Sequence, residues 1–260
     1  MPNYVLLAIA HGVEFSKIQN DYAQPLIDRI KSYLTDEEKN YLIPAPYNYT
    51  VKTNLRQVAM FEATDKGLGN EELRRLKHTI GSDVTWSFIV AKDGKECFYT
   101  DFVKDLSLMI ENYRKQYPRL KVICKGHSQG TQLFYSFFFD YPGFIDCFIS
   151  MGSPISMNSG AYPEGGKLAE NLGRWINFYQ WMDFISSKMQ GCPEPFSQEI
   201  ANFVIDYQIP MEWWKILYRL PHSLCKAMLG VGLMGHISYW RNDFVAKIIS
   251  DEVKRLIHLP

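Results

Sequence analysis

The chain has 260 residues, of which 47% are hydrophobic and 22% charged, so its composition is that of a globular protein rather than of a disordered or fibrous one. A chain of this length buries enough surface to fold without a disulfide or a metal. Lys and Arg together number 28 and so do Asp and Glu, and a nucleic-acid-binding protein normally carries a basic surplus. We therefore expect no nucleic-acid partner.

Strand-like and helix-like segments alternate along the chain. In the first half the apolar patterns predict strands at 4–10, 83–90 and 121–124, an extended segment at 41–49, a polar helix and loop at 57–78, and amphipathic helices at 20–34 and 101–117. In the second half they predict a Phe-rich helix at 129–141, strands at 144–151, 175–181 and 200–209, and a C-terminal helix at 238–258.

This alternation is typical of an α/β fold with a mostly parallel sheet and helices on both faces. We interpret residues 1–260 as a single domain of this class. Active sites of such sheets lie beyond the carboxyl ends of the strands, so the residues that directly follow each strand are the ones to consider.

The cysteines and the apolar segments restrict the setting. The five cysteines form no CxxC pair, and Cys124 and Cys147 lie in apolar runs that are typical of buried thiols. Reduced cysteines favour a cytoplasmic protein. No apolar segment is long enough to span a membrane, and no cluster of metal ligands is visible. We expect neither an integral membrane segment, nor a metal, nor another cofactor.

A G-x-S-x-G motif directly follows the predicted strand at 121–124. It consists of Gly126, His127, Ser128, Gln129 and Gly130, and a predicted helix comes next. A serine at such a tight turn projects its hydroxyl above the sheet, and the glycines let the strand and the helix approach closely. The motif predicts a nucleophilic serine at a helix N-terminus. The alternative is a glycine-rich turn whose serine only caps the helix.

With this motif in this context, the chain resembles the α/β-hydrolase superfamily, in particular its lipase- and esterase-like members. The resemblance covers nearly the whole chain, although the antiparallel strands with which that fold usually begins look reduced. It implies a catalytic triad in the chain order Ser, Asp or Glu, His.

The resemblance implies an acid after a strand that follows the motif. Asp183 comes shortly after the predicted strand at 175–181, and together with Asn177, Tyr179 and Ile185 it fits an N-x-Y-x-x-x-D-x-[IV] pattern of lipase-like members. Asp206 is the rival, although it lies in the body of a predicted strand rather than beyond its end.

The resemblance also implies a base between the last strand and the closing helix. His236 meets this condition, and its H-x-S-Y-W stretch resembles the loop that carries the catalytic histidine in lipase-like members. His222 is the weaker alternative. His258 lies too close to the C-terminus, and His127 is expected to pack within the serine turn.

The oxyanion hole of this fold takes one donor from the residue after the nucleophile, here the N–H of Gln129. The second would come from the loop after the first strand, where His11 and Gly12 resemble the H-G loop of the family. We assign it to the N–H of Val13, with Gly12 and Glu14 as neighbouring alternatives.

Residues 211–235 lie between the last predicted strand and the proposed base. Trp213, Trp214 and Leu217 give this segment an apolar face, and insertions near the site often act as lids in the superfamily. We interpret it as a lid or pocket wall. A helix packed permanently on the core and the surface of a homodimer are the alternatives.

These features together predict a serine hydrolase that cleaves carboxylic esters of small molecules or lipids through Ser128, Asp183 and His236. A thioesterase or an amidase with the same triad is the nearest alternative, and a non-catalytic binding protein of the same fold or a lipid-binding protein of the membrane surface are the others. Aromatic residues make up 15% of the chain and gather around the candidate residues, which favours an apolar, aromatic-walled acyl site.

Overall fold

The structure is a computed structural model, and it describes residues 1–11, 22–47, 98–153, 155, 168–180, 183, 186, 188–189, 203–210 and 238–260. The described strands form one sheet in the order β2-β1-β3-β4-β5-β6, and all five pairings are parallel. The strands are β1 (Tyr4–Ala10), β2 (Leu42–Pro46), β3 (Leu120–His127), β4 (Cys147–Met151), β5 (Trp175–Tyr179) and β6 (Val204–Gln208).

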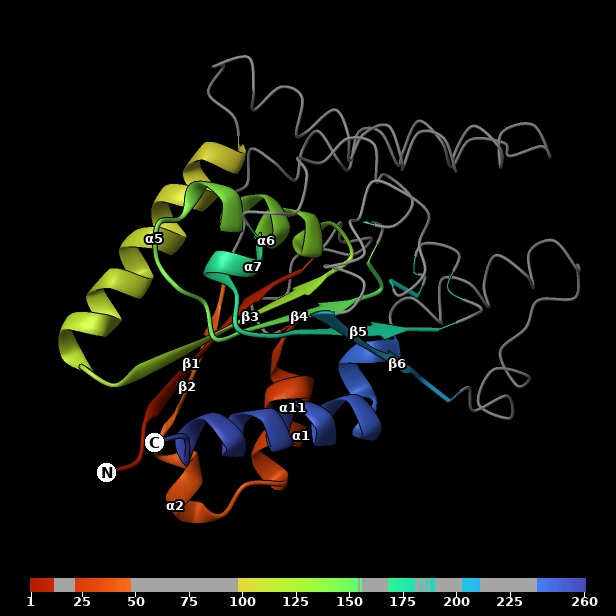
Figure 1. The fold of residues 1–260 in the computed structure, drawn as a ribbon. Coiled ribbons are helices and arrows are strands. Elements are labelled where there is room, and N and C mark those ends of the chain that lie inside the picture. Colours follow the sequence, from red (N-terminus) through yellow and green to blue (C-terminus); the bar gives the residue numbers. More distant parts are fainter. Residues whose placement is uncertain are drawn as a thin grey trace, which may run out of the picture.

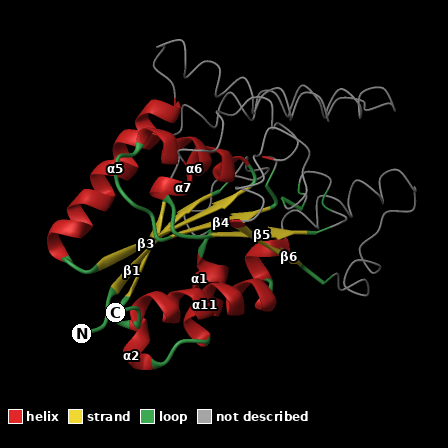
Figure 2. Ribbon diagram, in the orientation of Figure 1, coloured by secondary structure: helices red, strands yellow, loops and turns green. Residues whose placement is uncertain are grey.

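Helices cover both faces of this sheet (Figures 1 and 2). One face carries α5 (Phe98–Gln116), α6 (Gln129–Asp140) and the short α7 (Leu168–Asn171). The other face carries α1 (Gln24–Ser32) and α11 (Asp243–Ile257), with the short α2 (Asp36–Lys39) beside them. The expected α/β class with a parallel sheet between two helical layers is therefore confirmed.

Strand β1 is buried from both sides, which explains why its sequence is a continuous apolar run rather than an alternating one. Leu6 and Ala8 contribute to the core beneath α5 and α6, whereas Leu7 and Ile9 contribute to the core beneath α1 and α11. Residues 5–10 are at most 1% exposed. The strand thus contributes to the cores on both faces of the sheet.

The Phe-rich helix α6 uses its rings to build the first of these cores. The ring of Phe134 lies 5.5 Å from that of Phe102 on α5 and 6.4 Å from that of Phe148 on β4, and Phe138 lies 5.0 Å from Phe148. The Phe148 ring in turn lies 5.1 Å from the ring of Trp175 on β5. A considerable part of the aromatic excess therefore stabilises the core behind the turn at Ser128.

Several boundaries differ from the sequence prediction. The strand expected at 121–124 continues to His127, because Gly126 and His127 pair with Ser150 and Met151 of β4. The strand expected at 144–151 begins only at Cys147. The segments 57–78 and 83–90, for which a helix with a loop and a strand were expected, lie outside the described residues.

The long helix expected at 238–258 is interrupted. A 3-10 helix, η3 (Tyr239–Arg241), is followed by Asn242, whose side-chain oxygen accepts hydrogen bonds from the N–H groups of Phe244 and Val245. An asparagine at this N-cap position satisfies backbone donors that the first helical turn leaves unpaired. It therefore starts α11 anew and lets the preceding segment turn toward the carboxyl ends of the strands.

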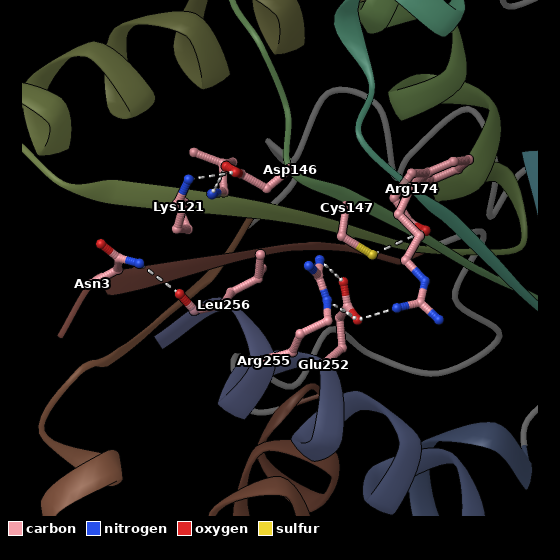
Figure 3. A network of polar contacts seen from close by, with 10 residues as sticks. Asn3, Lys121, Asp146, Cys147, Arg174, Glu252, Arg255 and Leu256 are labelled. Carbon is pink, nitrogen blue, oxygen red and sulfur yellow. Dashed lines mark hydrogen bonds and ion pairs between the residues drawn. The ribbon is translucent and has the colours of Figure 1, made fainter. Parts of the chain in front are cut away.

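Polar contacts fasten α11 to the opposite, amino-terminal edge of the sheet (Figure 3). Glu252, only 3% exposed, receives hydrogen bonds from Arg174 at 3.1 Å and from Arg255 at 2.7 Å. The Asn3 amide donates to the carbonyl oxygen of Leu256 at 2.8 Å, so the two ends of the chain lie side by side.

The two described cysteines, Cys124 and Cys147, are free and fully buried, as the sequence predicted. Burial raises the pKa of both thiols, so they remain protonated. The described helices include none with the length and hydropathy needed to cross a bilayer.

Candidate active site

The strand order places the candidate site at the reversal point of the sheet. Strand β1 lies between β2 and β3, so the chain leaves β1 toward one side for β2 and continues on the other side with β3. The loops that follow two such strands diverge and leave a crevice at their carboxyl ends, where ligands of open α/β sheets bind. His11 directly follows β1 and Ser128 directly follows β3, so both lie at this crevice.

Ser128 has the strained geometry of a nucleophile turn. It is the single residue between β3 and α6, with φ 53° and ψ −126°, and no other described residue except glycine has a positive φ. Such a conformation costs about 1–3 kcal/mol and persists only where the surroundings impose it. Its N–H donates to the carbonyl oxygen of Met151 at 3.0 Å, which holds the turn against β4.

Two glycines of the motif are required by close approach. A Cβ on Gly126 would lie 2.6 Å from the backbone of Thr131, and a Cβ on Gly130 would collide with the carbonyl oxygen of Ala10. Neither neighbour is a flexible side chain, so neither can move aside. The first turn of α6 is thereby pressed against the carboxyl end of β1, where the second oxyanion donor was expected.

Side-chain hydroxyls brace the start of α6 further. The Thr131 hydroxyl lies 2.6 Å from the carbonyl oxygen of Ser128 and donates to it, and it also lies 2.9 Å from the Ser153 hydroxyl. The Ser153 oxygen in turn accepts from the N–H of Ile155 at 3.3 Å. The serine turn and the loop after β4 are therefore joined by one buried network.

Asp183 lies beyond the carboxyl end of β5, two strands away from β3. Its N–H donates to the carbonyl oxygen of Gln180 at 3.0 Å, and its side chain is buried, with 2% of the residue exposed. The hydroxyl of Tyr239 donates to its Oδ2 at 2.9 Å. The carboxylate is therefore directed toward η3, which follows His236 in the chain.

Asp206, the rival acid, is used differently. It lies within β6, and its Oδ1 accepts hydrogen bonds from the amide of Asn177 at 2.7 Å and from the N–H of Met189 at 3.1 Å. Asn177 also accepts from the hydroxyl of Ser150 at 2.8 Å. Because this chain of contacts runs across neighbouring strands, Asp206 holds β4, β5 and β6 together on one face of the sheet.

A group of rings joins the carboxyl ends of β1 and β3 to η3 and to the segment before α1. We call it the ring cluster; it consists of His11, Tyr22, His127, Tyr239 and Trp240. The Trp240 ring lies 5.3 Å from that of Tyr22 and 5.3 Å from that of His127, while Tyr22 lies 4.2 Å from His11 and His127 lies 5.8 Å from Tyr239. Three of these four pairs are edge-to-face, and such contacts fix the relative placement of the segments that carry them.

The remaining sequence-predicted residues are accounted for as follows. The ring of His127, which was expected to pack within the serine turn, lies in the ring cluster, and the backbone of Gln129 begins α6. The ring of His258 lies 3.3 Å from the carboxylate of Glu38 at the end of α11, on the side of the sheet away from Ser128. Outside the described residues lie Gly12, Val13, Glu14, His222, His236, Ile185 and the segment 211–235 with Trp213, Trp214 and Leu217.

Lys125, which was not predicted as a site residue, lies in β3 three residues before Ser128. The side chain is fully buried, and its Nζ has no hydrogen-bond partner among the described residues. The Nζ lies 3.1 Å from the centroid of the Trp240 ring. Burial lowers the pKa of Lys125 well below its usual range. A lysine in the middle of an apolar strand is the only sequence signal that could have drawn attention to it.

The comparisons with known proteins agree with this geometry. Residues 92–219, just under half of the chain, match the family described as serine aminopeptidase, S33, which is a family of α/β-hydrolases. The matched part includes Ser128 and Asp183 and ends before His236. A search among curated proteins finds no match. With its parallel sheet and its serine turn, the chain has the α/β-hydrolase fold, and the family match supports a serine hydrolase of that superfamily.

The described residues include no group of three or more His, Cys, Asp or Glu side chains that could hold a metal ion. The side chains at the crevice instead offer a hydroxyl, a buried carboxylate and imidazoles, together with the N-terminus of α6. Groups of this kind suit nucleophilic attack on a carbonyl carbon and stabilisation of the resulting oxyanion.

We predict that Lys125→Met stabilises the protein at neutral pH and that this gain shrinks as the pH rises. In the folded state the pKa of Lys125 is lowered, so the unfolded chain binds more protons between that pKa and about 10.4. The stability of the wild type therefore rises with pH across this window. Above it, Lys125 is neutral in both states, and the cost of burying its charge disappears.

Urea unfolding at pH 7, 9 and 10.5 measures the difference. Lys247→Met, an exposed position on α11, is the matched control and should leave the free energy of unfolding unchanged within about 0.5 kcal/mol. A difference between Lys125→Met and wild type that stays constant over this range would contradict the prediction.

Proposed function

We propose that the protein hydrolyses carboxylic esters through an acyl-enzyme formed on Ser128, with Asp183 and His236 completing the triad. The observation that carries the proposal is the strained turn at Ser128, placed between the central strand β3 and the N-terminus of α6. A serine that only capped a helix would need no such conformation, and Ser128 makes no side-chain capping hydrogen bond.

In the proposed mechanism, His236 accepts the proton of the Ser128 hydroxyl as the serine oxygen attacks the carbonyl carbon. Asp183 orients the imidazole and stabilises the imidazolium that forms. His236 then protonates the leaving alcohol. A water molecule, activated by the same imidazole, hydrolyses the acyl-enzyme and restores Ser128.

The chain order of the strands supports this assignment. Asp183 follows β5 and lies at the same edge as Ser128, because the described strands are all parallel. His236 comes between β6 and α11 in the chain, and we expect it at this edge too. The contact between Asp183 and Tyr239 supports it further, because Tyr239 is only three residues beyond His236.

The oxyanion would be stabilised by the N–H of Gln129 at the start of α6 and by the N–H of Val13. The close packing of Gly130 against the Ala10 carbonyl supports the role of the Gln129 N–H, because it fixes the start of α6 beside the carboxyl end of β1. Loss of one such donor typically costs about 2.7–4 kcal/mol of transition-state stabilisation.

The substrate class we propose is a small-molecule ester with an apolar acyl group. The apolar segment 211–235, read as a lid or pocket wall, and the absence of net charge support it. The matched family gives the second candidate, aminopeptidase activity, because its description names serine aminopeptidases. The two buried thiols support the proposal that this reaction takes place in the cytoplasm.

Replacing the nucleophile should abolish turnover. Ser128→Ala is expected to lower kcat on p-nitrophenyl butyrate by a factor of about 10⁴–10⁶, because only binding and the oxyanion donors remain. Spectrophotometric initial rates measure this, and Ser136→Ala on the same helix is the matched control, expected to keep its activity. A Ser128→Ala variant with wild-type turnover would refute the assignment.

We expect substitution of Asp183 to affect catalysis and substitution of Asp206 to affect stability. Asp183→Asn is expected to reduce kcat about 10³–10⁴-fold while the fold stays intact. Asp206→Asn should keep kcat within about tenfold of wild type but lower the free energy of unfolding by about 1–3 kcal/mol, since it weakens a buried hydrogen-bond network. Full activity in Asp183→Asn would exclude it as the triad acid.

Substrate preference distinguishes the two candidate functions. We expect kcat/KM for p-nitrophenyl butyrate to exceed that for leucine p-nitroanilide by at least about 100-fold, because the proposed site binds an apolar acyl group. Parallel assays of both chromogenic substrates with wild type and Ser128→Ala give the ratio. A preference for the aminoacyl anilide would favour the aminopeptidase and contradict the ester proposal.

A further inference from the structure

We propose that Tyr239 is a positioning residue for the acid of the triad, and the inference rests on the proposed function. Its hydroxyl would hold the carboxylate of Asp183 in the orientation that His236 requires. Tyr239 and Asp183 are 56 residues apart in the chain and come from different segments of the sheet edge. Nothing in the motif around either residue calls for this contact.

The hydrogen bond between Tyr239 and Asp183 is short and shielded from solvent. The Tyr239 hydroxyl donates to Oδ2 of Asp183 at 2.9 Å, with 0% of Tyr239 and 2% of Asp183 exposed. A hydrogen bond to an ionised carboxylate is among the stronger ones in proteins, and here water does not compete for either partner. Turning the carboxylate away would leave a buried phenol without its acceptor.

The direction of the hydrogen bond follows from the surroundings. Burial and the charge of Asp183 raise the pKa of Tyr239 well above its ordinary value, so the phenol keeps its proton. A phenol has one hydrogen, and this one is given to Asp183. The hydroxyl of Ser186, 2.9 Å from the phenol oxygen, is therefore the donor in that second contact.

The result is a directed chain in which Ser186 donates to Tyr239 and Tyr239 donates to Asp183. Each donor in such a chain polarises the next, which strengthens the bond to the carboxylate. The bond to Tyr239 engages Oδ2 of the carboxylate. The same tyrosine also begins η3, directly after the segment of the proposed base, so one contact ties acid and base segments together.

Neighbouring elements hold Tyr239 in place and define its electrostatic surroundings. Strand β3 contributes His127, whose ring lies 5.8 Å from that of Tyr239, and Lys125, which lies over the adjacent Trp240. The carboxylate of Asp183 itself comes from the segment after β5. Removal of the Tyr239 hydroxyl alone leaves all of these rings in contact, so it tests the hydrogen bond rather than the packing.

Tyr239→Phe is the decisive variant. We expect kcat on p-nitrophenyl butyrate to fall about tenfold with KM changed less than about twofold, because the lost contact acts on the transition state and not on substrate binding. The acidic limb of the pH profile of kcat/KM should move to higher pH, since an Asp183 without its donor is easier to protonate and its less shielded charge favours the imidazolium.

Tyr141→Phe provides the matched control. Tyr141 is also buried, and its hydroxyl donates to a carboxylate oxygen, that of Glu111, at 3.0 Å, but at the far end of α6. This variant should keep both kcat and the pH profile of the wild type. Ser186→Ala, which leaves Tyr239 in place, should reduce kcat in the same direction by about two- to threefold, and it serves if Tyr239→Phe folds poorly.

A double-mutant comparison separates positioning from general structural damage. In an Asp183→Ala background, Tyr239→Phe should change the residual rate less than about twofold, because the tyrosine acts only through the carboxylate. An equal loss in both backgrounds, or a Tyr239→Phe enzyme with wild-type kcat and pH profile, would overturn the inference. If wild-type turnover instead survived Asp183→Ala, the triad itself would fail, and the positioning role with it.

Discussion

The structure depends on the passage from β3 to α6 through the single residue Ser128. A turn this tight forces a positive φ on a residue with a side chain, and the two glycines beside it let α6 press against the ends of β1 and β3. The paired strands on either side of β3 and the large aromatic core behind α6 supply the stabilisation that offsets this strain. The fold therefore presents one hydroxyl, held rigidly, at the reversal point of its sheet.

A second level of organisation connects distant parts of the chain to that hydroxyl. The ring cluster joins the ends of β1 and β3 to η3, and the contact between Tyr239 and Asp183 joins η3 to the segment after β5. Each segment carries, or directly adjoins, a residue proposed for the reaction. Side chains held by buried hydrogen bonds and ring contacts are positioned more precisely than side chains on free loops. The same contacts that stabilise the fold therefore also position the site residues.

Much of this could be predicted from the sequence, because the informative patterns are local. The apolar run of β1 and the G-x-S-x-G motif each depend on neighbours in the chain. The structure has the predicted strand at Tyr4–Ala10 and the predicted strand, turn and helix around Ser128. The start of α11 at Asn242 and the extension of β3 to His127 depend on capping geometry and on pairing with β4, which periodicity does not record. The contact of Tyr239 with Asp183 and the buried Lys125 arise only when distant segments meet, so no spacing rule reveals them.

The central claim is that Ser128 is the nucleophile, and covalent labelling tests it most directly. The intact protein would be treated with a fluorophosphonate, digested, and examined by mass spectrometry for the modified residue. The account predicts one phosphonyl adduct, on Ser128, with labelling lost after heat denaturation because the turn and the base no longer activate the hydroxyl. An unmodified protein, or an adduct confined to another residue, would contradict it.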